Sequence, residues 1–372
     1  MNETRRDETR GAPALRRTTR DPEELARRLT AWVTTWQPGA VVTRYEIPPT
    51  NGMSSETVLF DLQRPGATPR PCVLRLAADP LAYTVFPRYD MARQYRTIAL
   101  VAERTKVPVP RLLRLETDPG PLGAPGFVME RAFGRVPPDV LPYTYPGNWL
   151  YEASAHQRDQ LERSTVEALA ELHTVPAAEA PFLTPDADGD TALRRHVNEQ
   201  RAYYAWVIAD HSPSPLIERT FDRLEELWPE DPGEPVLSWG DARIGNIVYA
   251  ADFTPCAVLD WEMASVGPRE LDLGWLVFLH RFFQDLTEGS GHLGLPGFLD
   301  LGRVAARYAQ LTGHTPRDME FYSLYAALRH ALVMLRVGYR RVHFGEIPLP
   351  TDTDGLILHR PAIENMLEGR YW

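Results

Sequence analysis

The feature that most constrains the fold is a change in hydrophobic periodicity near Arg131. Before it, short runs with the apolar and β-branched residues of strands occupy 41–47, 57–62, 71–76, 107–116 and 126–134. One helical pattern, at 90–104, interrupts these runs, and Asn51-Gly52 marks a turn after the first. This order predicts a mostly antiparallel sheet with one inserted helix.

Beyond Arg131 the apolar residues recur at helical spacing. Helices are predicted over 158–173, 193–210, 215–227, 270–286, 299–312, 318–344 and 362–367. Gly338 is a candidate break in one of them. Short strands interrupt this region at 237–240, 246–250 and 255–261. We expect an α+β protein with a small β-rich lobe, a larger helical lobe and a ligand cleft between them.

The expected boundaries follow from composition and capping. Residues 1–20 are polar and Arg-rich without periodicity, which predicts a flexible tail. Asp21 followed by Pro22 is typical of a helix start, and the apolar spacing continues to about Trp36. We therefore expect an N-terminal lobe with a leading helix over 21–131 and a C-terminal helical lobe over 132–372.

Composition excludes several classes of function. The net charge of −10 argues against general nucleic-acid binding, and no apolar run reaches the length of a membrane span. The first residues lack the apolar core of a signal peptide. Cys72 and Cys256 lie in strand-like runs and are interpreted as reduced thiols. These observations predict a soluble cytoplasmic protein of undetermined oligomeric state.

The stretch from Val236 to Trp275 carries the candidate chemistry. In Gly240-Asp241-Ala242-Arg243-Ile244-Gly245-Asn246, the glycines allow a tight loop that presents Asp241 and Asn246 at its two ends. A carboxylate can orient a hydroxyl and accept its proton, and an amide oxygen suits Mg²⁺. Asp260 ends the next apolar run. Spacing alone leaves open that these Asp and Asn residues serve only their turns.

Three motifs in this order, WGDARIGN, VLDWE and ELDLGW, resemble the aminoglycoside phosphotransferase-like family. The resemblance covers roughly residues 40–345 and is strongest to the actinobacterial branch related to the phosphotransferase domains of acyl-CoA dehydrogenases. It implies a protein-kinase-like fold and a small-molecule kinase that uses ATP or GTP with Mg²⁺.

The resemblance assigns roles to the acidic stretch. Asp241 matches the catalytic Asp, and Asn246 and Asp260 match the residues that bind Mg²⁺. Arg243 falls where protein kinases carry a Lys near the γ-phosphate. Asp272 matches an Asp that braces the catalytic loop from the following helix.

The resemblance also places the nucleotide in the first lobe. The loop over 51–55, with the hydroxyls of Ser54 and Ser55, resembles the loop that covers the phosphates. The hinge beside the base is expected at Met129, Glu130 and Arg131.

The phosphate anchor departs from the usual kinase pattern. The chain has a single lysine, Lys106, and it lies outside the anchoring strand, where the matching residue is Arg75. The glutamate expected on the following helix is replaced by Gln94, which cannot form a charge-assisted pair with Arg75. Asp90 and Glu103 are alternative partners.

The acceptor pocket is less constrained. The aromatic loop over 137–149 supplies Tyr143 and Trp149, and Glu262 and His280 are further candidates. No cluster of carboxylates suited to a polycationic aminoglycoside stands out. We therefore expect phosphoryl transfer to a hydroxyl of a small molecule, an aminoglycoside among the candidates. Hydroxyacyl and amino-alcohol acceptors, a silent nucleotide-binding pseudokinase and a plain binder of a hydrophobic ligand stay open.

Overall fold

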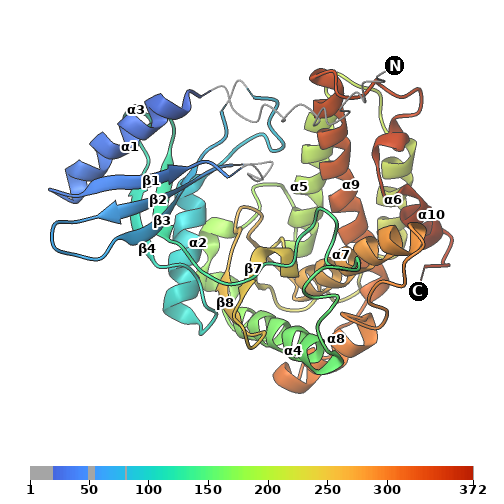
Figure 1. The fold of residues 1–372 in the computed structure, drawn as a ribbon. Helices are drawn as coiled ribbons and strands as arrows, with labels where there is room; N and C mark the ends of the chain where they lie inside the picture. Colours follow the sequence, from blue (N-terminus) through green and yellow to red (C-terminus); the bar gives the residue numbers. More distant parts are fainter. Residues whose placement is uncertain (1–19, 49–54, 80–81, 372) are drawn as a thin grey trace, which may run out of the picture.

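The structure, a computed structural model, describes residues 20–48, 55–79 and 82–371. It has the expected two parts, a five-stranded sheet with its helices and a larger helical region (Figure 1). The prediction of a two-lobed α+β fold is confirmed. Most of the predicted tail, and Ser54 in the candidate phosphate loop, lie outside the described residues.

The sheet is antiparallel in every pairing and has the strand order β1-β2-β3-β5-β4. Its strands are β1 (Val41–Glu46), β2 (Glu56–Gln63), β3 (Arg70–Leu76), β4 (Leu112–Glu116) and β5 (Gly126–Glu130). The helices of this lobe are α1 (Pro22–Trp36), α2 (Met91–Arg104) and the single turn α3 (Pro119–Leu122). The strands and the inserted helix therefore agree with the periodicity of the sequence.

The alternation of side chains along β3 explains why the sheet is covered on both faces. Cys72 and Leu74 belong to the apolar cluster that contains Leu29 of α1. Val73, between them, belongs to the other cluster, which contains Ile98 of α2. Since successive residues of a strand point to opposite faces, α1 and α2 pack on opposite sides of the sheet.

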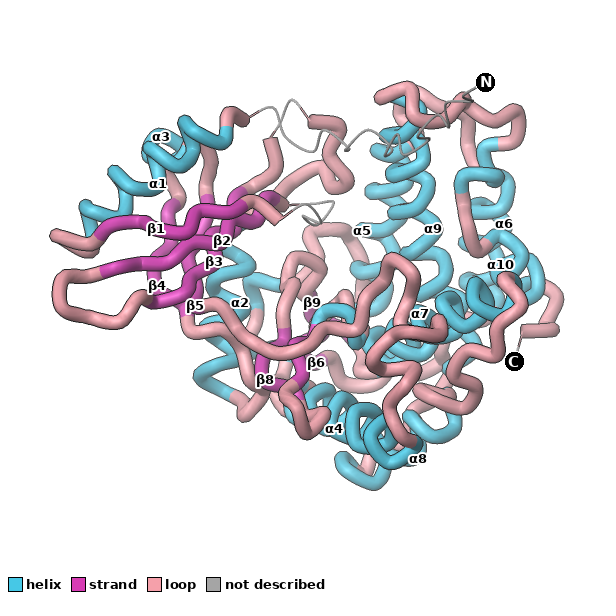
Figure 2. Tube along the Cα trace, viewed as in Figure 1, coloured by secondary structure: helices cyan, strands magenta, loops and turns pink. Residues whose placement is uncertain are grey.

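The second region is mainly helical, and its short strands form two two-stranded antiparallel sheets, β6 with β9 and β7 with β8 (Figure 2). The helices are α4 (Ala155–Leu172), α5 (Ala192–Val207), α6 (Pro215–Glu226), α7 (Glu270–Gly289), α8 (Leu301–Thr312), α9 (Met319–His343) and α10 (Arg360–Leu367). The strands are β6 (Val236–Ser238), β7 (Ile247–Tyr249), β8 (Pro255–Val258) and β9 (Ser265–Gly267). All four strands lie within the acidic stretch from Val236 to Trp275, and β6 and β7 flank the candidate catalytic loop and position it.

The candidate break at Gly338 was wrong, because α9 continues through it to His343. A Cβ atom at Gly338 would lie 2.8 Å from the Cβ atom of Leu356. The glycine therefore permits close packing of the C-terminal segment on α9 and does not end the helix.

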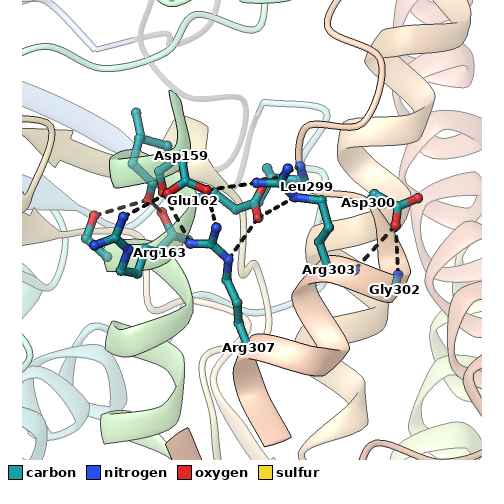
Figure 3. Close-up of polar contacts among 11 residues, drawn as sticks. Asp159, Glu162, Arg163, Leu299, Asp300, Gly302, Arg303 and Arg307 are labelled. Atoms are coloured by element: carbon teal, nitrogen blue, oxygen red, sulfur yellow. Dashed lines mark hydrogen bonds and ion pairs between the residues drawn. The ribbon is translucent and has the colours of Figure 1, made fainter. Parts of the chain in front are cut away.

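A buried charge network joins α4 to α8 (Figure 3). The Glu162 carboxylate is fully buried; it accepts a hydrogen bond from the Leu299 amide at 2.9 Å and pairs with Arg303 at 3.1 Å and Arg307 at 3.2 Å. Arg303 also pairs with Asp159 at 2.9 Å. A buried carboxylate needs such partners, so the network fixes the two helices against each other.

The segment between β3 and α2 reaches the helical region. The Tyr203 hydroxyl donates to the carbonyl of Val85 at 2.9 Å, and Arg336 Nε donates to that of Thr84 at 2.8 Å. In α2, Arg93 Nη2 donates to the carbonyl of Ala264 at 3.0 Å. The two lobes are thus in contact at places other than the point near Arg131 where the chain passes from one lobe to the other. In the part of the chain that the structure describes, no helix is long and apolar enough to cross a membrane.

Candidate active site

Asp241 lies in the loop between β6 and β7 and accepts three hydrogen bonds from side chains. Asn246 Nδ2 donates to Oδ2 at 2.6 Å, Trp275 Nε1 donates to Oδ1 at 2.7 Å, and Arg243 Nε lies 3.1 Å from both oxygens. The side chain keeps 15% exposure. The carboxylate is therefore fixed in direction while one part of it still faces open space.

The backbone before Asp241 requires glycine. Gly240 has a φ of +86°, which side-chain-bearing residues rarely adopt, and a Cβ atom there would lie 2.0 Å from the Met263 carbonyl oxygen. The loop after Glu262 therefore packs directly on the catalytic loop, and a larger residue would separate them.

Asp272, near the start of α7, is fully buried beneath this loop. Its Oδ1 accepts from Ser238 Oγ at 2.9 Å and from the Gly240 amide at 2.8 Å. Its Oδ2 accepts from the Trp239 amide at 2.8 Å and from His173 Nε2 at 3.0 Å. Burial acts to raise the pKa of Asp272, but the hydrogen bonds from His173 and the two amides outweigh it and lower that pKa.

These contacts are the ones that the predicted brace needs. Trp239, the neighbouring loop residue, is 2% exposed, and its indole Nε1 donates to the carbonyl of Leu259 at 2.9 Å. Its ring also packs against Trp261 with the ring centroids 5.8 Å apart. A tryptophan before Gly240 thus supports the loop by packing and by a hydrogen bond shared between the carbonyls of Leu259 and Asp260, just after β8.

Arg243 is held between two carboxylates, of which sequence reasoning identified only Asp241. The second is Asp139, which forms an ion pair with Arg243 from the segment that follows the hinge. Burial acts to lower the pKa of Arg243, but the two carboxylates outweigh it and raise that pKa. A Cβ atom at Gly245 would lie 2.6 Å from an Asp139 carboxylate oxygen, so glycine makes room for this pair.

Asn246 lies immediately before β7, and Asp260 lies two residues after the end of β8, the strand that pairs with β7. The Leu259 amide donates to the Asn246 carbonyl at 2.9 Å, which brings Asp260 to the level of the catalytic loop. Asp260 has a φ of +59°, an uncommon conformation for a residue other than glycine. Such strained positions cluster at functional sites, where the surrounding structure holds them.

The Asp260 carboxylate pairs with Arg75 of β3, with Oδ1 3.4 Å from Nη2. Arg75 therefore finds its carboxylate in the opposite lobe, and neither alternative partner is used in this way. Asp90 instead caps α2 by accepting from the Arg93 amide at 2.8 Å, and Glu103 lies beside Arg104.

A cavity of about 270 Å³ opens where the two lobes meet. It brings together the predicted nucleotide-lobe residues Arg75, Gln94, Met129, Glu130 and Arg131 with Asp260. Its remaining walls are mostly apolar, which suits the planar ring of the predicted nucleotide base. Gln94 is 5% exposed within this wall. Ser55, at the edge of the candidate phosphate loop, is also buried at 3% exposure.

The candidates for the acceptor pocket are dispersed. Tyr143 and His280 are buried at 2% and 5% exposure, and the Tyr143 hydroxyl lies 3.1 Å from His280 Nδ1. Burial lowers the pKa of His280 to about 3, so this is a neutral pair. Aromatic packing in the core encloses both side chains, which does not favour a place in the acceptor pocket, and their assignment to it stays a prediction.

Trp149 and Glu262 are half-buried and reach different surroundings. The Trp149 ring lies under the Arg135 guanidinium, 4.6 Å from its centroid, just beyond the hinge. Burial and the nearby Glu262 carboxylate both raise the pKa of Tyr89, which places Glu262 toward the segment between β3 and α2. Both assignments to the acceptor remain predictions.

The fold and this loop define a class of protein, a two-lobed phosphotransferase of the kinase-like type. A family model described as the phosphotransferase enzyme family matches residues 46–325. The chain belongs to this family, and the predicted membership of a phosphotransferase family is confirmed.

Relatives and solved structures agree with that assignment. The chain is 24% identical over 298 residues to the probable acyl-CoA dehydrogenase IBR3 of Arabidopsis thaliana, covering 76% of this chain and 35% of that protein. It is 27% identical over 223 residues to human acyl-CoA dehydrogenase family member 11, covering 58% and 27%. The chain thus spans about a third of the length of these relatives.

Among solved structures, a putative aminoglycoside phosphotransferase from Ralstonia eutropha superposes with a TM-score of 0.66 at 21% identity, covering 93% of this chain and 97% of that one. A type I macrolide 2'-phosphotransferase gives a TM-score of 0.56 at 17% identity, covering 84% and 92%. At these identities the structures establish the shared fold.

Proposed function

We propose that this protein transfers the γ-phosphoryl group of ATP or GTP to a hydroxyl of a small molecule. The observation that carries the proposal is the Asp241 carboxylate, fixed by three donors beside Asn246 and Asp260. Phosphoryl transfer depends mainly on positioning and on compensation of charge, and this loop supplies both.

Asp241 orients the acceptor hydroxyl and accepts its proton as the phosphoryl group is transferred. Arg75 lines the cavity and Arg243 lies in the loop beside Asp241, and each is paired with a carboxylate that a polyphosphate would replace, so both contact phosphate oxygens. The purine lies in the cavity at Met129, Glu130 and Arg131.

The donor set fits Mg²⁺. Among the residues described, no group of three or more His, Cys, Asp or Glu side chains is arranged to hold a metal. Magnesium in kinases is held by few protein oxygens together with the phosphates, so an amide and a carboxylate suffice. Asn246 and Asp260 would hold the ion, which supplies compensation of the phosphate charge.

The acceptor is a hydroxyl compound whose class the pocket leaves broad. Aminoglycosides are candidates by family, and one structural neighbour was solved with hygromycin B. Hydroxyacyl and amino-alcohol compounds are equally compatible with a pocket without clustered carboxylates. The names of the relatives that carry a similar segment favour testing hydroxyacyl compounds early.

A silent nucleotide-binding protein is the second candidate. The observation that favours it is Gln94, which stands in the cavity wall where an α2 carboxylate would tether the phosphate anchor. The ion pair of Arg75 with Asp260 argues against it, since this pair positions the arginine without that carboxylate.

The test is thermal unfolding with ATP and with GTP, each with and without Mg²⁺, for wild type, Asp260→Ala and the surface control Glu167→Ala. Ligand at ~100 times Kd adds about 2.7 kcal/mol to the native state, a readily measured shift. We expect a Mg²⁺-dependent shift in wild type and Glu167→Ala that Asp260→Ala abolishes.

Transfer is then tested by a mass-based screen of hydroxyl compounds. We expect Asp241→Asn to bind nucleotide and to lose product formation. A nucleotide shift without product from any acceptor class would favour the silent protein. The absence of any shift would contradict both candidates.

A further inference from the structure

Gly240, the residue that precedes Asp241, is held at both its amide and its carbonyl. The Gly240 amide donates to Asp272 at 2.8 Å, and its carbonyl accepts a hydrogen bond from Arg329 Nη2 at 3.0 Å. Arg329 comes from the centre of α9, whereas Asp272 comes from the start of α7. Two helices therefore fix the two peptide groups on either side of the Gly240 Cα, and with the second of these the direction in which the Asp241 side chain leaves the backbone.

Arg329 also contacts the side chain that binds Asp241. Its guanidinium carbon lies 4.5 Å from the centroid of the Trp275 ring, the geometry of a cation–π contact. Trp275 Nε1 donates to Asp241 Oδ1 at 2.7 Å. A single arginine thus supports both the backbone before Asp241 and the indole that holds its carboxylate.

The burial of Arg329 is costly and calls for a reason. The residue is 2% exposed, and its Nε has no hydrogen-bond partner among the residues described. Burial lowers the pKa of this guanidinium, and the hydroxyl of Tyr325 and the carboxylates of Asp272 and Asp241 oppose that effect. An apolar residue would pack α7 against α9 without such a penalty. A buried charge at this place is explained by its hydrogen bond to the Gly240 carbonyl and by the carboxylates in its neighbourhood.

Trp275 differs from the other two donors to Asp241. In the proposed reaction, Asn246 also serves the metal and Arg243 also serves the phosphates. Trp275 has neither role, and at 3% exposure its ring is enclosed between α7 and α9. Its N–H is therefore the donor to Asp241 that has no second ligand in the proposed reaction.

We infer that Trp275 and Arg329 are positioning residues that hold Asp241 in the direction required for transfer. This inference rests on the proposed function for its kinetic consequence, but the contact itself is independent of it. The substitution that isolates it is Trp275→Phe, which keeps an aromatic ring and removes the N–H.

A matched control exists in the other lobe. Trp32 of α1 donates from Nε1 to the Glu116 carboxylate at the same distance, 2.7 Å, far from the catalytic loop. Trp32→Phe therefore removes the same kind of hydrogen bond without touching Asp241. Any effect of Trp275→Phe beyond that of Trp32→Phe reports on the position of Trp275.

The kinetic measurement is phosphate release from Mg·ATP with water as the acceptor. We expect Trp275→Phe to lower kcat about tenfold or more, with KM for ATP within about twofold of wild type, because a hydrogen bond to a charged group is lost. Trp32→Phe keeps the wild-type kcat. A purely structural role would lower the melting temperature of Trp275→Phe and leave kcat unchanged, and that result would overturn the inference.

The second measurement needs no turnover. Of the nine tryptophan indole ¹⁵N–H signals, the one missing in Trp275→Phe belongs to Trp275. We expect this signal to be protected from exchange with solvent and to shift in Asp241→Asn and in Arg329→Lys, while the Trp32 signal stays in place. A Trp275 signal that is indifferent to both substitutions would overturn the inference. If the wild-type protein neither released phosphate nor bound nucleotide, that result would contradict the proposed function. The indole signals would still decide whether Trp275 donates to Asp241 in solution.

Discussion

The brace beneath the catalytic loop gives a prediction whose size follows from its hydrogen bonds. Asp272→Asn keeps the shape of the side chain but replaces one acceptor oxygen by an NH₂ group. If that group stands at Oδ1, the Gly240 amide loses its acceptor; if it stands at Oδ2, the Trp239 amide does. Ser238 and His173 can reverse their roles, since a hydroxyl rotates and an imidazole changes tautomer.

One buried backbone N–H is therefore left without an acceptor in either orientation. Such a group costs about 1–3 kcal/mol, and the three remaining hydrogen bonds lose the assistance of the charge. We expect Asp272→Asn to lower the free energy of unfolding by about 3 kcal/mol.

Urea unfolding followed by circular dichroism measures this difference, with the slope m compared between variants. The control is Glu225→Gln, since Glu225 pairs with Arg194 at 2.8 Å on the surface with 40% of its side chain exposed. An exposed pair contributes about 0–1 kcal/mol. A loss in Asp272→Asn no larger than in this control would refute the account of the brace.

Three further predictions follow from single contacts. Gly240→Ala should lower the free energy of unfolding, measured in urea, by about 2 kcal/mol or more, because the added Cβ meets the Met263 carbonyl. The control is Gly39→Ala, where φ is +78° and the space around the glycine is open, and it should lower that free energy by only about 1 kcal/mol. The pKa of Asp272 is lowered in the folded state, so the ionised side chain contributes its full stabilisation of the fold above the unfolded pKa of about 3.9. That stabilisation is lost as the pH falls through the folded pKa. The difference in free energy of unfolding between wild type and Asp272→Asn should therefore narrow in an acid titration below about pH 4. Burial raises the pKa of Cys72 to about 12, so a thiol reagent at mildly alkaline pH should label it only after unfolding, and rapid labelling of the native protein would contradict its burial.

The periodicity of the sequence predicted the fold well because each element carries its own signal. The strands of the sheet alternate between two buried faces, and the helices repeat an apolar stripe, so neither needs distant information. The candidate catalytic loop was proposed for a related reason: Asp241, Asn246 and Asp260 lie within a short stretch marked by glycines and apolar runs. The break expected at Gly338 failed because a glycine inside a helix has two explanations, and only the packing of Leu356 distinguishes them.

The residues that sequence reasoning missed act across long separations. Asp139 precedes its partner Arg243 by more than a hundred residues, and Arg329 follows Gly240 by almost as many. No periodicity or spacing marks such pairs, because their meeting depends on how whole helices pack. A charged residue in the middle of an apolar helix was the one available signal for Arg329, since a buried charge requires a partner.

The replacement of the usual lysine and glutamate pair is best understood as one change. In the structure, Arg75 reaches across the cleft to Asp260, with which it forms its ion pair, while Gln94 closes the wall behind it. Arginine is longer than lysine and can bind two oxygens at once, so it can contact a carboxylate of the opposite lobe. A neutral glutamine on α2 then suits the site, because a second carboxylate near Asp260 would add repulsion between like charges. The proposed anchor for the phosphates is thereby coupled to the aspartate proposed to bind the metal, and its position depends on how the two lobes meet.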